Sequence, residues 1–184
     1  MRRGFKAEAE RMAADVRAEM GISQSVPLDS IALAKYAGAD VRCADELTDV
    51  SKLEALEKIQ PGAFSACTFT LDGLHVIVYS PLASPGRRQS DIAHEVAHIL
   101  LEHTVKEIEQ VGGLSFFTCD ADEEQEANWL AGCLLLPRRL VYMANRRGLD
   151  ARAIASQCGV SEQMAAFRIR ATGVDRQLRA SQTG

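Results

Sequence analysis

Two histidines and a glutamate in this sequence stand at the spacing of a helical metal-binding motif. Residues 94–98 read HEVAH, which has the form H-E-x-x-H. Because a helix turns by about 100° per residue, His94 and His98 lie about 40° apart on one face, where both imidazoles can bind one zinc ion. Glu95 lies beside that face and can reach a water molecule on the metal. The motif predicts His94 and His98 as metal ligands and Glu95 as the base of a hydrolytic reaction.

Two histidines do not complete a catalytic zinc site, which takes three protein ligands and keeps one position open for water. His103 follows His94 by nine residues. On a continued helix, its side chain would therefore point about 180° away from that of His94. His75 lies in a predicted strand, where we expect it to be an ordinary strand side chain rather than a metal ligand. We expect the third ligand to come from another segment of the chain.

The acidic start of a second buried helix offers such a ligand. Residues 120–137 read DADEEQEANWLAGCLLLP, and from residue 127 onward the predicted helix is apolar almost all round. Asp120 to Glu123 suit a helix N-terminus, where carboxylates complement the helix dipole. Glu124 shares a stripe with small residues, which let this helix approach the one that carries His94. We expect Glu124 to face the metal, and Asn128, one turn further along the helix, to hold the side chain of Glu124.

Other patterns predict the elements that must position these side chains. Two runs of β-forming residues within 63–79 are joined by Asp72-Gly73, a dipeptide that tolerates the positive φ angles of a hairpin turn. Apolar residues at helical spacing, with glycine or proline stops, predict helices. The predicted helices cover residues 5–20, 29–37, 47–59, 90–103 and 121–136, with shorter ones to the end and a further strand at 41–43. Helices with a small antiparallel sheet make an α+β fold.

The C-terminal segment differs in charge from the rest of the chain. Residues 1–137 carry 12 basic and 22 acidic side chains, a net charge of −10. Residues 138–184 carry nine arginines against three acidic residues, a net charge of +6. We expect residues 1–137 to form the core that holds the metal and residues 138–184 to form a basic helical segment packed on it. Residues 173–184 are expected to be a frayed end.

Within this segment, a glycine followed by a serine cap is typical of the middle of a helix-turn-helix. Gly159 would make the turn, and Ser161 would cap a second helix that runs to residue 172. The polar residues of that helix include Glu162, Gln163, Arg168 and Arg170. The arginines favour an acidic partner, nucleic acid included, but Glu162 lies at the helix end that would meet phosphates. DNA binding is therefore an alternative to docking on an acidic patch of a protein.

Composition excludes several classes of protein. The 184 residues are 47% hydrophobic and carry 25 acidic against 21 basic side chains, which excludes disordered and collagen-like chains. No apolar run is long enough for a membrane helix, and the charges among residues 2–8 stand where a signal peptide needs its apolar run. We therefore expect a cytoplasmic protein. Five widely spaced cysteines without a C-x-x-C pair predict reduced thiols rather than disulfides.

Two stretches of the chain together resemble the ImmA/IrrE family of metallopeptidases, which are gluzincin-type zincins. They are DIAHEVAHILLEH at residues 91–103 and EQEANWLAGCLLLP at 124–137, supported by VPLDSIALAKYAG at 26–38 and HVIVYS at 75–80. The resemblance covers roughly residues 25–172 and implies a zincin-like core. It implies that the third ligand is the first glutamate of E-x-x-A-N, which is Glu124 here. Glu126 is the alternative, because the run of acidic residues allows the motif to be aligned on either glutamate.

The resemblance also implies a function. Such proteins cleave a helix-turn-helix transcriptional repressor selectively, which relieves repression under stress or during induction of mobile elements. The metal would be zinc or manganese. An extended substrate would add to the edge of the hairpin, as in similar zincins; the alternative is that this edge only packs against the rest of the chain. His75 and Tyr79 are the candidates for substrate contact, and both, together with Tyr142, for a second oxyanion donor.

Two other functions stay open on the sequence. One is a zinc-containing module that binds a repressor or an antitoxin without cutting it, against which the intact Glu95 argues. The other is a DNA-binding regulator that uses the arginine-rich segment, for which salt-dependent binding to duplex DNA would be the sign.

Overall fold

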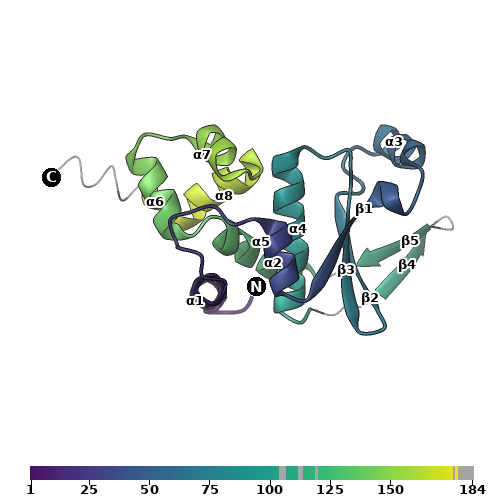
Figure 1. Ribbon diagram of the computed structural model, residues 1–184, viewed down its shortest axis with the longest axis horizontal. Helices are drawn as coiled ribbons and strands as arrows, with labels where there is room; N and C mark the ends of the chain where they lie inside the picture. Colours follow the sequence, from purple (N-terminus) through teal and green to yellow (C-terminus); the bar gives the residue numbers. More distant parts are fainter. Residues whose placement is uncertain (104–106, 112–113, 119, 176, 178–184) are drawn as a thin grey trace.

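The computed structural model describes residues 1–103, 107–111, 114–118, 120–175 and 177 of the chain. These residues form an α+β fold, as predicted, with a small sheet at one end and most of the helices at the other (Figure 1). The elements in chain order are α1 (Phe5–Glu19), α2 (Ser30–Tyr36), β1 (Ala39–Cys43), the 3₁₀ helix η1 (Ala44–Glu46), α3 (Val50–Ile59), β2 (Ala66–Leu71), β3 (Leu74–Tyr79), α4 (Pro85–Leu100), β4 (Glu107–Val111), β5 (Leu114–Thr118), α5 (Ala121–Leu135), α6 (Arg138–Arg146), α7 (Ala151–Cys158) and α8 (Glu162–Thr172).

The three-stranded sheet is mixed, so the prediction of an antiparallel sheet is only partly right. β2 and β3 pair antiparallel with Leu71 opposite Leu74, which leaves Asp72 and Gly73 as a two-residue turn with φ of 50° and 81°. Positive φ at both positions confirms the predicted hairpin. β1 pairs parallel with β3, and the strand order is β1-β3-β2. The two strands of a parallel pair need a long crossover connection between them. The short β pattern at 41–43 does not indicate which strand it pairs with or in which direction. A separate hairpin of β4 and β5 was not predicted.

The helix of the H-E-x-x-H motif begins and ends earlier than predicted. The Ser84 hydroxyl accepts a hydrogen bond from the Arg87 backbone N–H, and Pro85 occupies the first turn, so α4 starts at residue 85 rather than 90. At the other end, α4 stops at Leu100, because Glu102 has a φ of 54° through which no α-helix continues. The chain therefore changes direction just before residue 103.

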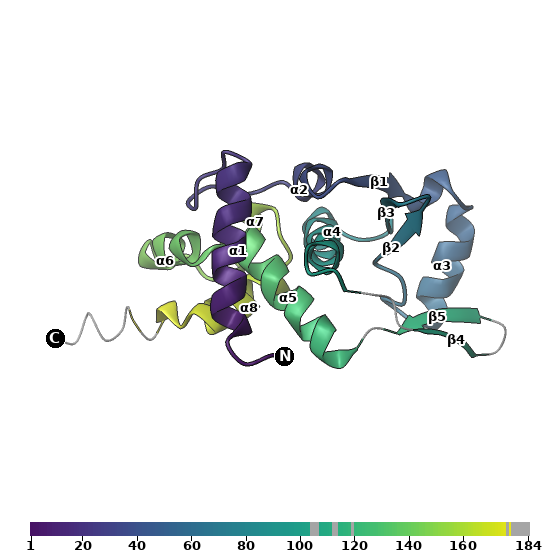
Figure 2. The same ribbon diagram turned by 90° about the horizontal axis from the view of Figure 1, so that it is seen from below.

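α4 and α5 pack against each other in the middle of the molecule, between the sheet and α1 (Figure 2). Both helices bury small residues, namely Ala93, Ala97, Ala127 and Ala131. This contact agrees with the expectation that a stripe of small residues brings the two helices together. α1 lies across α5 in Figure 2 and buries Phe5 and Ala9. The two helices that carry the predicted ligands are thus held from both sides.

α7 and α8 are joined as the sequence predicts. Gly159 has a φ of 67°, and the Ser161 hydroxyl accepts a hydrogen bond from the Met164 backbone N–H. The turn between the two helices is packed against the first turns of α4. The backbone N–H of Ser161 donates to the Ser90 hydroxyl at 3.0 Å, and the two hydroxyls lie 3.1 Å apart.

Arg168 is buried, contrary to the expectation that α8 presents it to a partner. Its Nε donates to the Leu136 carbonyl at 2.9 Å, and its Nη2 donates to a Glu10 carboxylate oxygen at 2.8 Å. Carbonyls at the C-terminal end of a helix lack intrahelical partners, so this guanidinium satisfies one just after α5. The exposed arginines described in this segment are Arg138, Arg139, Arg146, Arg147, Arg152 and Arg170.

The stretch after α8 is ordered as far as the structure describes it, which corrects the prediction of a frayed end from residue 173. Val174 is fully buried. The Asn145 amide donates to the Asp175 carboxylate, and Arg138 donates to the Gln177 side-chain oxygen. Residues 178–184 lie outside the described part of the chain.

Some features lie away from the predicted site. The predicted amphipathic helix at 47–59 is present as α3, but none of its residues is buried, and Ile59 is 83% exposed.

Cys43, Cys67, Cys133 and Cys158 are free thiols as predicted, whereas Cys119 falls outside the described residues. Of the helices that the structure describes, none combines the length and the apolar character that a bilayer crossing demands.

Candidate metal centre

α4 and α5 bring three predicted ligands together. His94 and His98, one turn apart on α4, have their Nε2 atoms 3.1 Å from each other. Glu124, in the first turn of α5, directs one carboxylate oxygen to each ring: Oε2 lies 3.2 Å from His94 Nε2, and Oε1 lies 3.4 Å from His98 Nε2. Within the described residues, these three side chains form a group whose donor atoms converge closely enough to hold a metal ion.

The spacing of these donor atoms fits a tetrahedral ion. Zinc binds imidazole nitrogen and carboxylate oxygen at about 2.0–2.2 Å, so neighbouring ligand atoms of a tetrahedron lie about 3.3–3.5 Å apart. The two imidazole nitrogens are 3.1 Å apart, and each lies 3.2 or 3.4 Å from a different oxygen of Glu124, so all three separations are near that edge length, and a small turn of the carboxylate would bring one oxygen to the ion. Two imidazoles and one carboxylate also form a donor set that leaves a fourth position for water. The triad of His94, His98 and Glu124 can therefore hold a divalent metal ion.

The members of the triad change one another's acidity. Hydrogen bonds with His94 and His98 hold the pKa of Glu124 well below its usual range, although partial burial acts in the opposite direction. Burial by itself would lower the pKa of His94. The hydrogen bond with Glu124 and the charges of Glu95 and Asp91 outweigh it, so the pKa of His94 is raised. A proton and a metal ion therefore compete for the same imidazole.

Glu95 stays out of the triad, and the hydroxyl of Thr68 holds it. Thr68 Oγ1 donates to Glu95 Oε2 at 2.7 Å from β2, an outer strand of the sheet. This contact fixes one oxygen of the carboxylate and leaves the other for a proton. Nothing in the sequence singled out Thr68, because a threonine in an alternating strand carries no chemical signal of its own.

His103 lies beside the triad, so the prediction that it would point away is wrong. Because α4 ends early, the chain turns back, and the His103 backbone N–H donates to the His98 carbonyl at 3.0 Å. His103 Nδ1 lies 3.0 Å from His98 Nδ1, the ring atom of His98 that does not face the triad. Burial, and after it the charge of His98, lowers the pKa of His103. His103 is thus the neighbour of a candidate ligand and not a member of the triad.

Glu126 and Asn128, the other polar residues of α5 that the sequence brought forward, have different partners. The Glu126 carboxylate accepts hydrogen bonds from the backbone N–H and the Nε of Arg2, at 2.7 to 3.2 Å. Asn128 Nδ2 donates to the main-chain carbonyl of Glu124 at 2.8 Å, a contact within α5 that does not involve the Glu124 carboxylate. Of the two glutamates considered as third ligand, Glu124 is the one that reaches both imidazoles.

The residues expected to contact substrate have partners elsewhere. His75 Nδ1, on β3, lies 3.3 Å from the hydroxyl of Thr70 on β2. The Tyr79 ring lies 5.8 Å from the Arg88 guanidinium. Tyr142 belongs to α6, which Figures 1 and 2 both place at the end of the molecule opposite the sheet. Its position removes Tyr142 from the candidates for an oxyanion donor.

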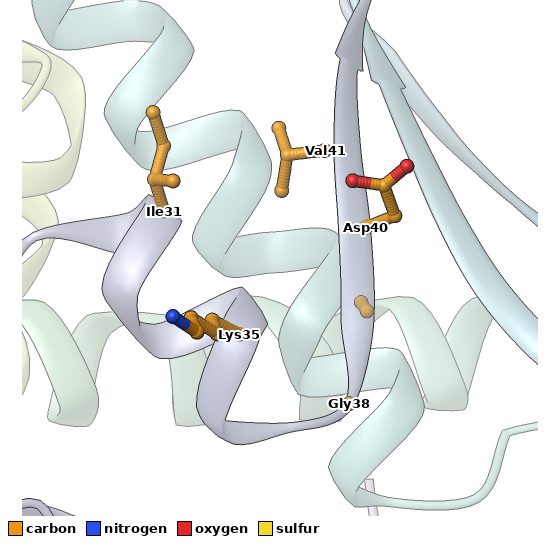
Figure 3. A pocket seen from close by; sticks show the side chains of 6 residues that line it. Ile31, Lys35, Gly38, Asp40 and Val41 are labelled. Carbon is orange, nitrogen blue, oxygen red and sulfur yellow. The ribbon is translucent and has the colours of Figure 1, made fainter.

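Two surface hollows lie apart from the triad. One, of about 410 Å³, borders Arg138, Arg139, Tyr142 and Gln177. The other, of about 430 Å³, lies between α2 and β1 (Figure 3) and is lined by Ile31, Lys35, Gly38, Ala39, Asp40 and Val41. In Figure 3 the side chains of Lys35 and Asp40 point in different directions, so they do not converge on a common ligand. The candidate site is therefore defined by its converging side chains.

Two histidines and a glutamate around one point, with a second carboxylate beside them, are the arrangement of a metal-dependent hydrolase. The family profile of the IrrE N-terminal-like domain, which describes M78 peptidases, matches residues 58–170. Because this match covers more than half of the chain, the protein belongs to the ImmA/IrrE family of metallopeptidases. The match crosses residue 137, where the sequence suggested a boundary. No curated protein and no solved structure matches the chain.

Proposed function

We propose that this protein is a zinc-dependent endopeptidase that cleaves a helix-turn-helix transcriptional repressor. The observation that carries the proposal is the convergence of His94, His98 and Glu124 beside Glu95, a carboxylate outside the triad that Thr68 holds by one oxygen. Membership of a peptidase family supports a peptide bond as the target. The repressor as substrate, and relief of repression as the result, follow from resemblance to the family.

In this proposal, each residue of the site has a separate task. Bound zinc would lower the pKa of water to about 7 and polarise the carbonyl under attack. Glu95 accepts a proton from the attacking water and passes it to the leaving amine. Thr68 keeps one oxygen of Glu95 occupied, so the proton travels through the other. His94, His98 and Glu124 hold the ion and take no part in proton transfer.

The sheet supplies a surface for an extended substrate. β2 is an outer strand, and Thr68 on this strand bonds to the proposed base. A peptide that adds to β2 as a further strand would therefore lie beside Glu95. His75 and Tyr79, on the adjacent strand β3, are proposed as weaker contacts of the same substrate.

The packing of the C-terminal helices supports a place within the peptidase rather than independent reading of DNA. A helix-turn-helix needs its second helix free to enter the major groove. Here Ser161, at the start of α8, bonds to Ser90 of α4, and Arg168 is inaccessible. We therefore propose that the exposed arginines of residues 138–170 dock an acidic face of the protein substrate.

Glu95→Gln tests the assignment of the base, because it preserves size and removes the proton acceptor. Purified protein is incubated with zinc and a candidate helix-turn-helix repressor, and the fragments are weighed by mass spectrometry. We expect the variant to lose cleavage by about 100-fold or more while its affinity for zinc is unchanged. Glu54→Gln, an exposed glutamate on α3, is the matched control and should cleave like the wild type.

Two results would contradict this proposal. Unimpaired cleavage by Glu95→Gln would assign the base to another residue. Tight binding of the repressor by the zinc-loaded wild type, with no fragments after long incubation, would favour a non-cleaving module.

A further inference from the structure

A chain of polar contacts leads away from one of the proposed metal ligands. His98 turns its Nε2 to Glu124 and its Nδ1 to His103, whose own Nδ1 is 3.0 Å away. His103 Nε2 lies 3.9 Å from Glu126 Oε2, and the same carboxylate accepts hydrogen bonds from Arg2. The side chains of His103 and Glu126 are only 8% and 6% exposed, so water competes little for these contacts.

We propose that His103 is a positioning residue that orients the metal ligand His98. It accepts a hydrogen bond from the Nδ1–H of His98, which keeps the Nε2 of that ring directed at the ion, while the Glu126 carboxylate, held by Arg2, lies 3.9 Å from the other ring nitrogen of His103. This inference rests on the proposed metal site, but it does not depend on cleavage of a peptide.

The direction of each hydrogen bond follows from the atoms that face one another. A histidine that binds a metal through Nε2 carries its proton on Nδ1 and donates it to a partner. Two facing Nδ1 atoms can share one hydrogen bond only if the second is bare, so His103 must carry its proton on Nε2. That atom lies 3.9 Å from the Glu126 carboxylate, which is too far for a direct hydrogen bond, but the negative charge there favours a proton on Nε2. On its other side, the Glu126 carboxylate accepts hydrogen bonds from the backbone N–H and the Nε of Arg2.

The backbone fixes His103 in this position. Its N–H donates to the His98 carbonyl, and the two rings meet edge to face with centroids 5.0 Å apart and planes at 70°. The other histidine of the triad is held differently, since His94 Nδ1 is buried and finds no hydrogen-bond partner among the residues that the structure describes. The proposed orienting contact is therefore specific to His98.

The test is the affinity for zinc, measured with the metal alone by competition against a chromophoric chelator. His103→Phe keeps a ring and removes the acceptor, so its dissociation constant for zinc should rise about 10- to 100-fold. His103→Asn places an amide oxygen near the position of Nδ1 and should restore binding to within about threefold of the wild type. His75→Asn, a histidine outside the contact chain, is the control for zinc affinity and should bind zinc like the wild type.

Urea unfolding of the metal-free variants separates orientation from stability. A His103→Phe protein that is less stable but binds zinc as tightly as the wild type would overturn the proposal, and so would equal weakening by phenylalanine and asparagine. If the wild type bound no zinc, both this inference and the proposed function would fail. If it bound zinc and cleaved nothing, only the proposed function would fail.

A measurement on the wild type keeps the proposal testable even where the phenylalanine variant does not fold. Long-range proton–nitrogen NMR spectra of the zinc-loaded protein report which ring nitrogen of each histidine carries the proton. We expect Nδ1–H for His98 and Nε2–H for His103. A proton on Nδ1 of His103 would overturn the proposal.

Discussion

The side chains around Glu95 differ sharply in what they can do, because each has a different partner. Thr68 donates its hydroxyl to the Glu95 carboxylate. Cys67, the preceding residue on β2, is largely desolvated and also feels the charge of Glu95, and both effects raise its pKa to about 12. A thiol beside a proposed active site is thereby kept protonated and is a poor nucleophile. The contacts, rather than the residue types, decide which of these groups is reactive.

Cys67 should therefore resist alkylation. With a pKa of about 12 instead of the ordinary 9.0, its thiolate fraction at pH 8 is lower by about a thousandfold. Because the pKa is raised, labelling by iodoacetamide should be slow at neutral pH and should accelerate as the pH rises towards 12. Peptide mass spectrometry after timed labelling measures this rate. Labelling of Cys67 at pH 8 as fast as that of free cysteine would contradict the prediction.

At the scale of elements, the sequence predicts what depends on neighbours in the chain and misses what depends on distant contacts. The spacing of His94 and His98 and the turn at Asp72-Gly73 are local, and the structure has both on the predicted elements. The end of α4 at Leu100 is set by a turn at Glu102, so the direction of His103 could not be read from helical periodicity. Burial of Arg168 depends on carbonyls and carboxylates from other segments. Parallel pairing of β1 likewise has no signal within that strand.

Gly86 tests a contact between elements that no sequence pattern indicated. A Cβ at this position would lie 2.5 Å from the Val160 carbonyl oxygen, in the turn between α7 and α8. Backbone cannot yield as a flexible side chain does, so Gly86→Ala should destabilise the protein by about 1–3 kcal/mol, although alanine is the better helix former. Urea unfolding measures the change. Arg87→Ala, on the exposed side of the same turn, should cost less than about 1 kcal/mol. A Gly86→Ala protein as stable as the wild type would mean that the turn between α7 and α8 does not pack on α4.

At the scale of the whole molecule, the triad joins two helices at the centre of the fold. α4 contributes two of its side chains and α5 the third, while the sheet and α2 contact α4 and α1 contacts α5. The donor atoms converge only when both helices are in place. An ion held by all three therefore binds the folded chain and not the unfolded one, and its binding free energy adds to the free energy of unfolding.

Zinc should consequently stabilise the protein, and the size of the effect in two variants identifies the third ligand. At a hundredfold excess over its dissociation constant, a ligand of the folded state adds about 2.7 kcal/mol, which for a chain of this length raises the melting midpoint by about 5–10 °C. A chelator should remove this gain. Glu124→Ala should lose nearly all of it, because two imidazoles alone bind the ion weakly. Glu126→Ala should keep most of it, since that carboxylate lies 3.9 Å from His103 and reaches the ion only through it. Calorimetry with zinc and with chelator measures both shifts, and the opposite ranking would place Glu126 on the metal in solution and Glu124 outside it.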